Sequence, residues 1–371
     1  MTFHNVIYLD YMSTTPVDPR VAEIMQRCLI SDGDFGNAAS STHVFGANAR
    51  ARINVAASQV ADLIQCDPNE ITWTSSATES IYRALTGVAL FYQRQGKHII
   101  TMTTEHKAVL DTCHYLEKLG FEVTYLNPEK NGLLNLKNIS DAIRKDTILC
   151  SIMHVNNETG IIQDIASIGK LLKEKGVWFH VDAAQSVGKL PINLKTLPVD
   201  LMSLSAHKIY GPKGVGALFM RRQPRVQLMN TMRFGTLPTH QIAGMGEACL
   251  IAKNNMSDEI NRIEKLRNQL WKNLSAINSV HLNGDLNHQV CGCLNISIDN
   301  MDADTLIKNC PDIAISTGSA CNSVDPEPSH VLLAMGLSRQ AANSSIRISM
   351  GRYTTVEDIE VASRQVINLS V

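Results

Sequence analysis

Short apolar runs alternate with longer amphipathic stretches through about the first 245 residues. The runs are rich in β-branched residues, which is typical of strands, and the stretches between them repeat apolar residues at helical spacing. Between residues 165 and 175, for example, Ile165, Ile168 and Leu172 share one stripe. This alternation predicts a mostly parallel sheet covered by helices on both faces. The predicted strands span residues 70–75, 98–104, 122–127, 147–155, 177–183, 199–206 and 216–222.

The pattern changes after about residue 245. A long amphipathic stretch at 258–277 predicts a helix, and the runs at 294–298 and 344–350 predict strands. A last helix is predicted near 356–369. These elements predict a smaller α+β domain behind a larger α/β domain, in keeping with a length of 371 residues.

Charge and composition exclude several classes of protein. The 34 Lys and Arg residues balance 35 Asp and Glu residues, and no run of like charge predicts a nucleic-acid or membrane surface. No apolar run approaches the ~20 residues of a membrane span, and the start, MTFHNVIYLDYMS, lacks the pattern of a signal peptide. We therefore expect a cytoplasmic protein.

The nine cysteines are irregularly spaced, which predicts free thiols in a reducing compartment. Cys291-Gly292-Cys293 is the one close pair, but no second Cys or His pair follows at the spacing of a zinc site. We therefore predict no metal and expect the edge of a strand there.

Ligands of open α/β sheets bind beyond the carboxyl ends of the strands, so the residues after each predicted strand carry the chemistry. Asp182 ends one apolar strand, where a buried carboxylate needs a cationic partner. Lys208 follows the next strand and precedes glycines that permit close approach of a ligand. Ser76-Ala77-Thr78-Glu79 has the pattern of a capping box, whose helix end can hold a phosphate. His106 follows a further strand.

Each signal alone has an ordinary structural explanation, because a strand-end Asp often caps a helix and most lysines are solvated. Together they match pyridoxal phosphate (PLP), which needs an amine for its aldehyde, a carboxylate for its ring nitrogen and donors for its phosphate. The sequence thus predicts a PLP site at one edge of the sheet.

Nine segments, in order along nearly the whole chain, resemble those of class V PLP enzymes, and among these the cysteine desulfurases of the IscS/NifS type. They are YLDYMSTTPVDPR, FGNAASSTH, TSSATES, TEHKAVL, SIMHVNNETG, HVDAAQSVGK, SAHKIYGPKG, STGSACNS and SSIRISMGR. The resemblance implies PLP fold type I and a homodimer. It implies an N-terminal segment (1–15) that joins the small domain, a large PLP-binding domain (16–250) and a small domain (251–371) that carries the catalytic cysteine loop.

The resemblance also implies a role for each site residue. Lys208 would bind PLP covalently and move the substrate Cα proton, His106 would stack on the ring and exchange protons, and Cys321 would be the nucleophile. Arg347 would bind the substrate carboxylate, with Asn157 near it. The implied cofactor ligands are Lys208, Asp182, Gln185, Asn157, Ala77, Thr78, Ser205 and His207, with Thr236 from the neighbouring subunit.

The implied reaction converts L-cysteine to alanine and leaves the sulfur on Cys321 as a persulfide, for delivery to an iron–sulfur scaffold protein or to a protein of nucleic-acid thiolation or phosphorothioation. Two other functions remain open: a weakened homologue that acts as a sulfur-relay scaffold, and another class V lyase or transaminase. The chain departs from the family pattern at Ser76, at Ala206, which we expect to add a methyl group next to the cofactor, at Tyr82, and in a loop before Thr236 that is about nine residues shorter.

Overall fold

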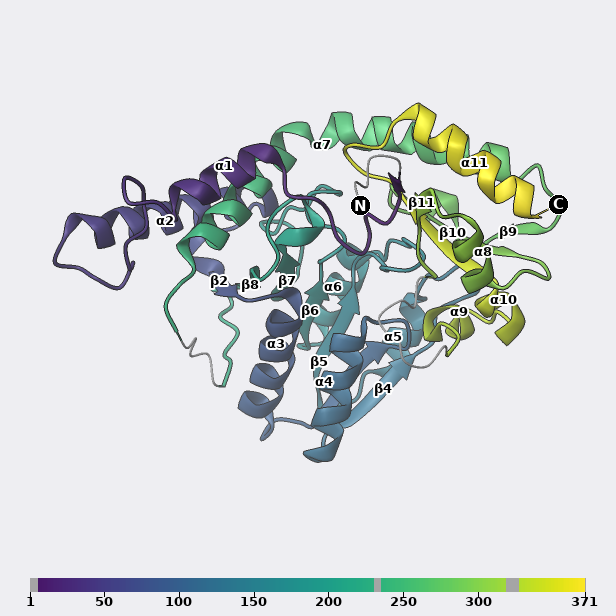
Figure 1. Ribbon diagram of the computed structural model, residues 1–371. Coiled ribbons are helices and arrows are strands. Elements are labelled where there is room, and N and C mark those ends of the chain that lie inside the picture. Colours follow the sequence, from purple (N-terminus) through teal and green to yellow (C-terminus); the bar gives the residue numbers. More distant parts are fainter. Residues whose placement is uncertain (1–5, 230–234, 318–326, 371) are drawn as a thin grey trace.

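Seven strands form the central sheet in a computed structural model that describes residues 6–229, 235–317 and 327–370 (Figure 1). Their order is β2-β8-β7-β6-β5-β3-β4. All neighbours from β7 to β4 are parallel, whereas β8 is antiparallel to both of its neighbours, which confirms the predicted, mostly parallel sheet. Every predicted strand is present and slightly shorter than expected: β2 Ile71–Thr74, β3 His98–Met102, β4 Glu122–Leu126, β5 Thr147–Met153, β6 Trp178–Asp182, β7 Leu201–Ser205 and β8 Gly216–Met220.

Helices cover both faces of this sheet, because successive strand residues point to opposite sides. Ile99 and Leu218 pack in a hydrophobic cluster with α3 and α4, whereas the adjacent Ile100 and Phe219 pack in a second cluster with α2, α6 and α7. The helices of the large part are α1 Pro19–Arg27, α2 Val44–Ile64, α3 Ala77–Tyr92, α4 Lys107–Lys118, α5 Leu136–Ala142 and α6 Ile165–Glu174, followed by α7 Thr239–Leu274.

Helix α7 begins well before residue 258, so the predicted start of the long helix was wrong. Its first half contains Gly244 and Gly246, which interrupt the amphipathic pattern used for the prediction. These glycines permit close packing, since a Cβ on Gly246 would lie 2.6 Å from the Cα of Ala56 on α2. The first half of α7 packs in the large core and the second half in the core of the small part. The predicted domain boundary at 250 falls inside this helix and stays a prediction.

The smaller part is built on a three-stranded antiparallel sheet in the order β12-β10-β9. Its strands are β9 Val280–Leu282, β10 Cys293–Ile298 and β12 Ser345–Ser349, and its helices are α8 Ala303–Asn309, α9 His330–Ala334, α10 Arg339–Asn343 and α11 Val356–Ser370. Near the N-terminus, β1 (Ile7–Tyr8) pairs in parallel with β11 (Ile313–Ala314). The N-terminal segment therefore lies against the small part before it crosses to the large one.

Within the described ranges, no helix has the length and apolar character that a bilayer span requires. The same residues contain no group of three or more His, Cys, Asp or Glu side chains that could hold a metal ion. Cys293 is buried and is the first residue of β10. The Cys291-Gly292-Cys293 segment therefore lies at the beginning of a strand, as expected.

Candidate active site

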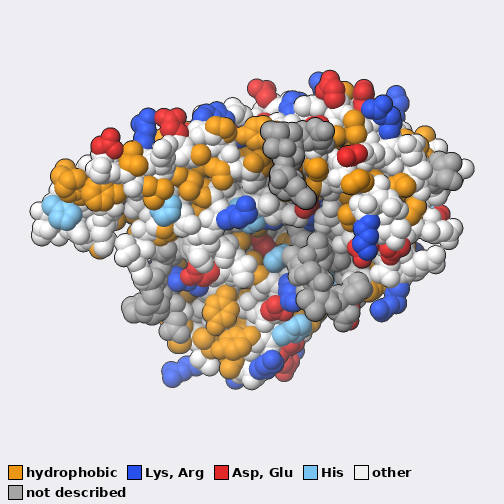
Figure 2. All heavy atoms as spheres, viewed as in Figure 1, with side chains coloured by type: hydrophobic (Ala, Val, Ile, Leu, Met, Phe, Trp, Pro, Cys, Tyr) orange, Lys and Arg blue, Asp and Glu red, His pale blue; other side chains and the backbone are white. Residues whose placement is uncertain are grey.

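A cavity of about 410 Å³ lies at the carboxyl ends of β5, β6 and β7. Figure 2 shows this face of the molecule hollowed, with charged and histidine side chains in the hollow. The cavity lies where open α/β sheets bind their ligands. Most of the predicted site residues line it: Ala77, Thr78, His106, Asn157, Asp182, Gln185, Ser205, His207, Lys208 and Arg347.

Two predicted residues are not among those that line this cavity, for different reasons. Thr236 is exposed and does not line the cavity. It had been expected to act in the neighbouring subunit. Cys321 lies outside the described residues.

The N-terminus of α3 forms one end of the cavity. Ser76 is its N-cap, and the Ser76 hydroxyl accepts a hydrogen bond from the Glu79 N–H at 3.1 Å. The Glu79 carboxylate reaches back one residue further than a capping box requires, to the N–H of Ser75 at 2.6 Å. The first N–H groups of α3, at Ala77 and Thr78, thus face the cavity as donors for an anion.

Gly216 on β8 permits this placement of the helix end. A Cβ at Gly216 would lie 2.7 Å from the carbonyl carbon of Ser76 and 3.0 Å from the nitrogen of Ala77. Any side chain there would push α3 away from the sheet, so the glycine fixes the distance between the strand ends and the donors of α3.

Asp182 ends β6, and its carboxylate accepts a hydrogen bond from the Ala184 N–H at 2.9 Å. Burial raises the pKa of Asp182, and the nearby His106 and Lys208 offset part of that rise. Among the residues that the structure describes, Asp182 forms no ion pair within 4.0 Å. A buried carboxylate that faces a cavity without a direct cationic partner is suited to a cationic ligand.

His106 is the N-cap of α4, and its Nδ1 accepts a hydrogen bond from the Ala108 N–H at 3.1 Å. This contact leaves Nε2 as the protonated nitrogen of the neutral ring. Burial lowers the pKa of His106, which favours the neutral ring. His106 therefore presents an imidazole N–H next to Asp182 and Lys208.

The N-terminal segment lies directly over Lys208. The Lys208 Nζ donates to the carbonyl oxygens of Met12 and Ser13 at 2.6 and 2.7 Å. The adjacent His207 contacts the Thr14 hydroxyl through Nδ1 at 3.1 Å, and burial lowers the pKa of His207 to about 4. Main-chain acceptors of the N-terminal segment thus hold the Lys208 amine at the cavity.

Ala206 does not add its methyl group to the cavity, which corrects the expectation from the sequence. The side chain is fully buried in the large hydrophobic core. A Cβ added to Gly211 would lie only 2.9 Å from the Ala206 Cβ. The methyl group therefore packs behind the Lys208 turn.

Arg347 projects from β12 of the small part and is only 3% exposed. Its two terminal nitrogens donate to the Asn157 carbonyl at 2.7 Å, to the Asp10 carboxylate at 2.6 Å and to the Ser13 hydroxyl at 2.7 Å. Its Nε has no acceptor in the described chain. Asp10 was not predicted as a site residue, although it lies in the YLDYMSTT segment, because nothing in the sequence pattern indicates that β1 pairs with β11.

Gln185 also has a partner that was not predicted from the sequence, Lys189. The Lys189 Nζ donates to Gln185 Oε1 at 2.9 Å, and Gln185 Nε2 donates to the Met12 carbonyl at 2.8 Å. The i,i+4 spacing of Gln185 and Lys189 in a helix-like turn was the available signal.

These groups fit PLP. The α3 end offers donors for a phosphate, Lys208 an amine for an aldehyde, and Asp182 a carboxylate for a protonated ring nitrogen. Asp182 is the deciding observation, because its buried charge lacks a direct cationic partner in the described protein. Ala77, Thr78, Ser205 and His207 would hold the phosphate, and Asp182, His106 and Gln185 the ring.

Comparisons with known proteins agree with this arrangement. The sequence profile of the family "Aminotransferase class-V" matches residues 7–361. The chain is 56% identical over 363 residues to the cysteine desulfurase IscS of Escherichia coli, an alignment that covers 95% of this chain and 90% of that protein. It is similar to a solved NifS-like protein, with a TM-score of 0.91 and 34% identity over 98% of this chain and 99% of the other. It is also similar to the structure "SspA in complex with cysteine", with a TM-score of 0.81 and 36% identity over 94% and 100%.

These matches confirm the fold class, the predicted family and its PLP dependence. Members of this family use PLP, and the chain retains the groups that would hold it. The chain belongs to the class V aminotransferase family of PLP-dependent enzymes and, within it, to the cysteine desulfurases of the IscS/NifS type.

Proposed function

We propose that the enzyme removes sulfur from L-cysteine, releases alanine and carries the sulfur on Cys321 as a persulfide. One observation carries the proposal: Lys208, Asp182 and Arg347 face the same cavity. An amine, a ring-binding carboxylate and a carboxylate-binding guanidinium are the groups that an amino acid substrate on PLP requires. The similar SspA, whose structure contains cysteine, supports this substrate.

Bound PLP supplies an electron-withdrawing ring that stabilises negative charge at the substrate Cα. Asp182 holds the proton on the ring nitrogen, and Arg347 binds the substrate α-carboxylate through its planar guanidinium. Arg347 reaches this position already oriented by Asp10 and Asn157.

Lys208 moves the proton at Cα as a neutral amine, for which the hydrogen bonds to Met12 and Ser13 must be released. His106 offers its Nε2–H at the same end of the cavity for the proton of the attacking thiol or of the product. The Cys321 thiolate then attacks the substrate sulfur: an S–S bond forms, the Cβ–S bond breaks, and its electron pair stays with the carbon fragment, which takes up protons and leaves as alanine.

We also propose that the enzyme is a homodimer in the cytoplasm, with a protein thiol as the sulfur acceptor. Large apolar side chains remain exposed on α3, on α4 and its C-cap, and beyond β8, namely Tyr82, Phe91, Tyr115, Leu119 and Met229. Figure 2 shows a cluster of hydrophobic side chains in the region of α3 and α4. A second copy of the chain would cover this surface and bring the exposed Thr236 to a neighbouring site.

The test is to measure alanine and sulfide from L-cysteine in the presence of a thiol reductant, with the purified enzyme and its Lys208→Ala and Cys321→Ala variants. Equal amounts of alanine and sulfide, lost in both variants, are expected. A transaminase or lyase acting on another amino acid would retain its activity in Cys321→Ala. A scaffold without catalysis would bind PLP and form no alanine in any of the three proteins.

A further inference from the structure

We propose that Lys189 is a positioning residue that turns the Gln185 amide so that its NH₂ group faces the cofactor. The inference rests on the proposed function, because it concerns PLP in the same site. It adds a residue that lies outside the cofactor cavity and acts on it through one hydrogen bond.

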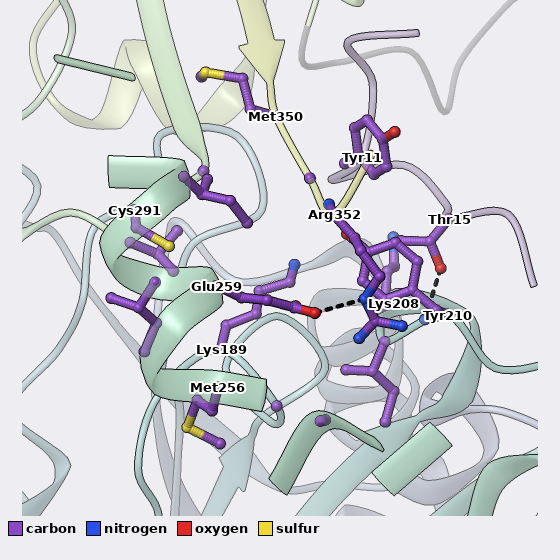
Figure 3. A pocket seen from close by; sticks show the side chains of 18 of the residues that line it. Tyr11, Thr15, Lys189, Lys208, Tyr210, Met256, Glu259, Cys291, Met350 and Arg352 are labelled. Carbon is purple, nitrogen blue, oxygen red and sulfur yellow. Dashed lines mark hydrogen bonds and ion pairs between the residues drawn. The ribbon is translucent and has the colours of Figure 1, made fainter. Parts of the chain in front are cut away.

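Local geometry brings Lys189 behind the site. The turn after β6 places Gln185 and Lys189 four residues apart, on one side. Gly188 has φ +74°, and a Cβ there would lie 2.8 Å from Ile209, the residue after Lys208. Only glycine lets this turn pack so closely behind the Lys208 segment. Figure 3 shows Lys189, Lys208 and Cys291 around a second, smaller cavity, of about 40 Å³.

The hydrogen bonds determine which way the amide points. The Lys189 Nζ can only donate while it is charged, so its partner at 2.9 Å must be the carbonyl oxygen of Gln185. The nitrogen of Gln185 then lies at the Met12 carbonyl, 2.8 Å away. One N–H bonds to Met12, and the second is available to the cofactor cavity, which Gln185 lines.

The reversed amide would place two donors against the ammonium group of Lys189. It would also turn its oxygen toward the Met12 carbonyl, so that both contacts would become repulsive. Without Lys189, a contact to Met12 alone would hold the amide. A ring oxygen of PLP is an acceptor, so only the observed orientation offers it a hydrogen bond.

No charged partner explains why a lysine stands here. Lys189 forms no ion pair in the described part of the chain. Its other neighbours are the Met12 sulfur, 3.6 Å away, the thiols of Cys291 and Cys293, and the like-charged Arg347. Burial raises the pKa of both thiols, that of Cys293 to about 11, so neither supplies a negative charge. The bond to Gln185 is therefore the main polar contact of this amine.

The experiment is a double-mutant cycle on full-length holoenzyme. The PLP dissociation constant is measured by equilibrium dialysis, and the visible absorption band of the bound cofactor is recorded, for Lys189→Met, Gln185→Ala and the double variant. We expect Lys189→Met to weaken PLP binding about tenfold and to shift the band. The double variant should bind no more weakly than Gln185→Ala, because both changes remove the same contact.

Lys189→Arg is the rescue variant, because a guanidinium keeps a hydrogen-bond donor and the small cavity provides space. The PLP affinity of Lys189→Arg should lie within about threefold of that of wild type. Lys170→Met, on the exposed face of α6, is the matched control and should change nothing. Independent, additive losses in the double variant, or wild-type affinity and spectrum in Lys189→Met, would overturn the proposal. Should Lys189→Met fail to fold, loss of affinity in a folded Lys189→Arg would overturn it instead. Failure of the wild type to bind PLP would contradict the proposed function and not this inference.

Discussion

Two cavities lie on either side of Lys208, and they differ in how their charged groups are paired. In the cofactor cavity, Asp182 has no ion pair and the Nε of Arg347 has no acceptor among the described residues. In the smaller cavity, Lys189 also lacks an ion pair within the described chain, but Arg352 donates to Glu259 at 2.6 Å and to Asp18 at 2.7 Å.

The guanidinium of Arg352 also lies 4.0 Å from the ring centroid of Tyr210, two residues after Lys208. The paired charges fix the Lys208 turn from behind, and the incompletely paired ones await a ligand in front. Buried charge thus has two uses in this protein: Asp182 and Arg347 keep capacity to bind a ligand, whereas the Arg352 network holds the Lys208 turn in place.

The largest effect is expected for Asp182→Asn, which tests the role of the unpaired carboxylate. We expect kcat to fall by about 10²–10³-fold with PLP still bound, because the amide cannot hold the charge of the ring. Asp200→Asn is the matched control: Asp200 is also a largely buried carboxyl with a raised pKa, but it precedes β7 at the opposite edge of the sheet. Near-normal kcat in Asp182→Asn would contradict the assignment.

Arg352→Met tests the paired cavity. The change leaves the buried Asp18 carboxylate with one guanidinium partner fewer, and we expect the free energy of unfolding in urea to fall by about 3 kcal/mol. Arg27→Met breaks an exposed pair with Glu23 and should cost less than about 0.5 kcal/mol. Equal losses in the two variants would show that the network behind Lys208 adds no stability.

Acid should weaken the same network. The hydrogen bond from Arg20, with a further contribution from Arg352, lowers the pKa of Asp18 to about 2. A carboxyl whose pKa is lower in the folded state stabilises the fold above its unfolded pKa of about 3.9, and this contribution is lost as the pH falls toward 2. The unfolding free energy of wild type should therefore drop more between pH 7 and pH 3 than that of Asp18→Asn. An equal decrease in unfolding free energy in the two proteins would contradict the lowered pKa of Asp18.

Ala206→Gly should have the smallest effect. Its methyl group packs in the core and not in the cofactor cavity, so kcat/KM for L-cysteine should stay near wild type. The added backbone freedom should lower the free energy of unfolding by about 0.5–1 kcal/mol. A large rise in kcat/KM would show that the methyl group does obstruct the site.

Much of this arrangement could be predicted from the sequence, because most of the site residues lie at or just after the end of a strand whose apolar run is easy to recognise. Asp182 and Lys208 stand directly after two such runs, and parallel strands bring their ends to one edge. Asp10 and Lys189 could not be predicted in the same way. Asp10 reaches Arg347 only because β1 pairs with a strand over 300 residues away, and no local pattern encodes that pairing.

The early start of α7 was missed for a related reason. Its glycines reduce helical propensity locally, and only the close contact with α2 makes them favourable. The position of Ala206 was missed because a residue at a strand end can point either way, and its direction depends on the turn that follows. In each case a contact between distant segments, and not the local sequence, determines the outcome.

The most direct test of the central claim is a single turnover with L-cysteine, without reductant, followed by mass spectrometry of the peptide that contains Cys321. The account predicts one alanine per active site and one added sulfur atom on Cys321. Both should be absent in Lys208→Ala and in Cys321→Ala. Alanine formed with its sulfur on another cysteine, or full alanine formation in Cys321→Ala, would contradict it.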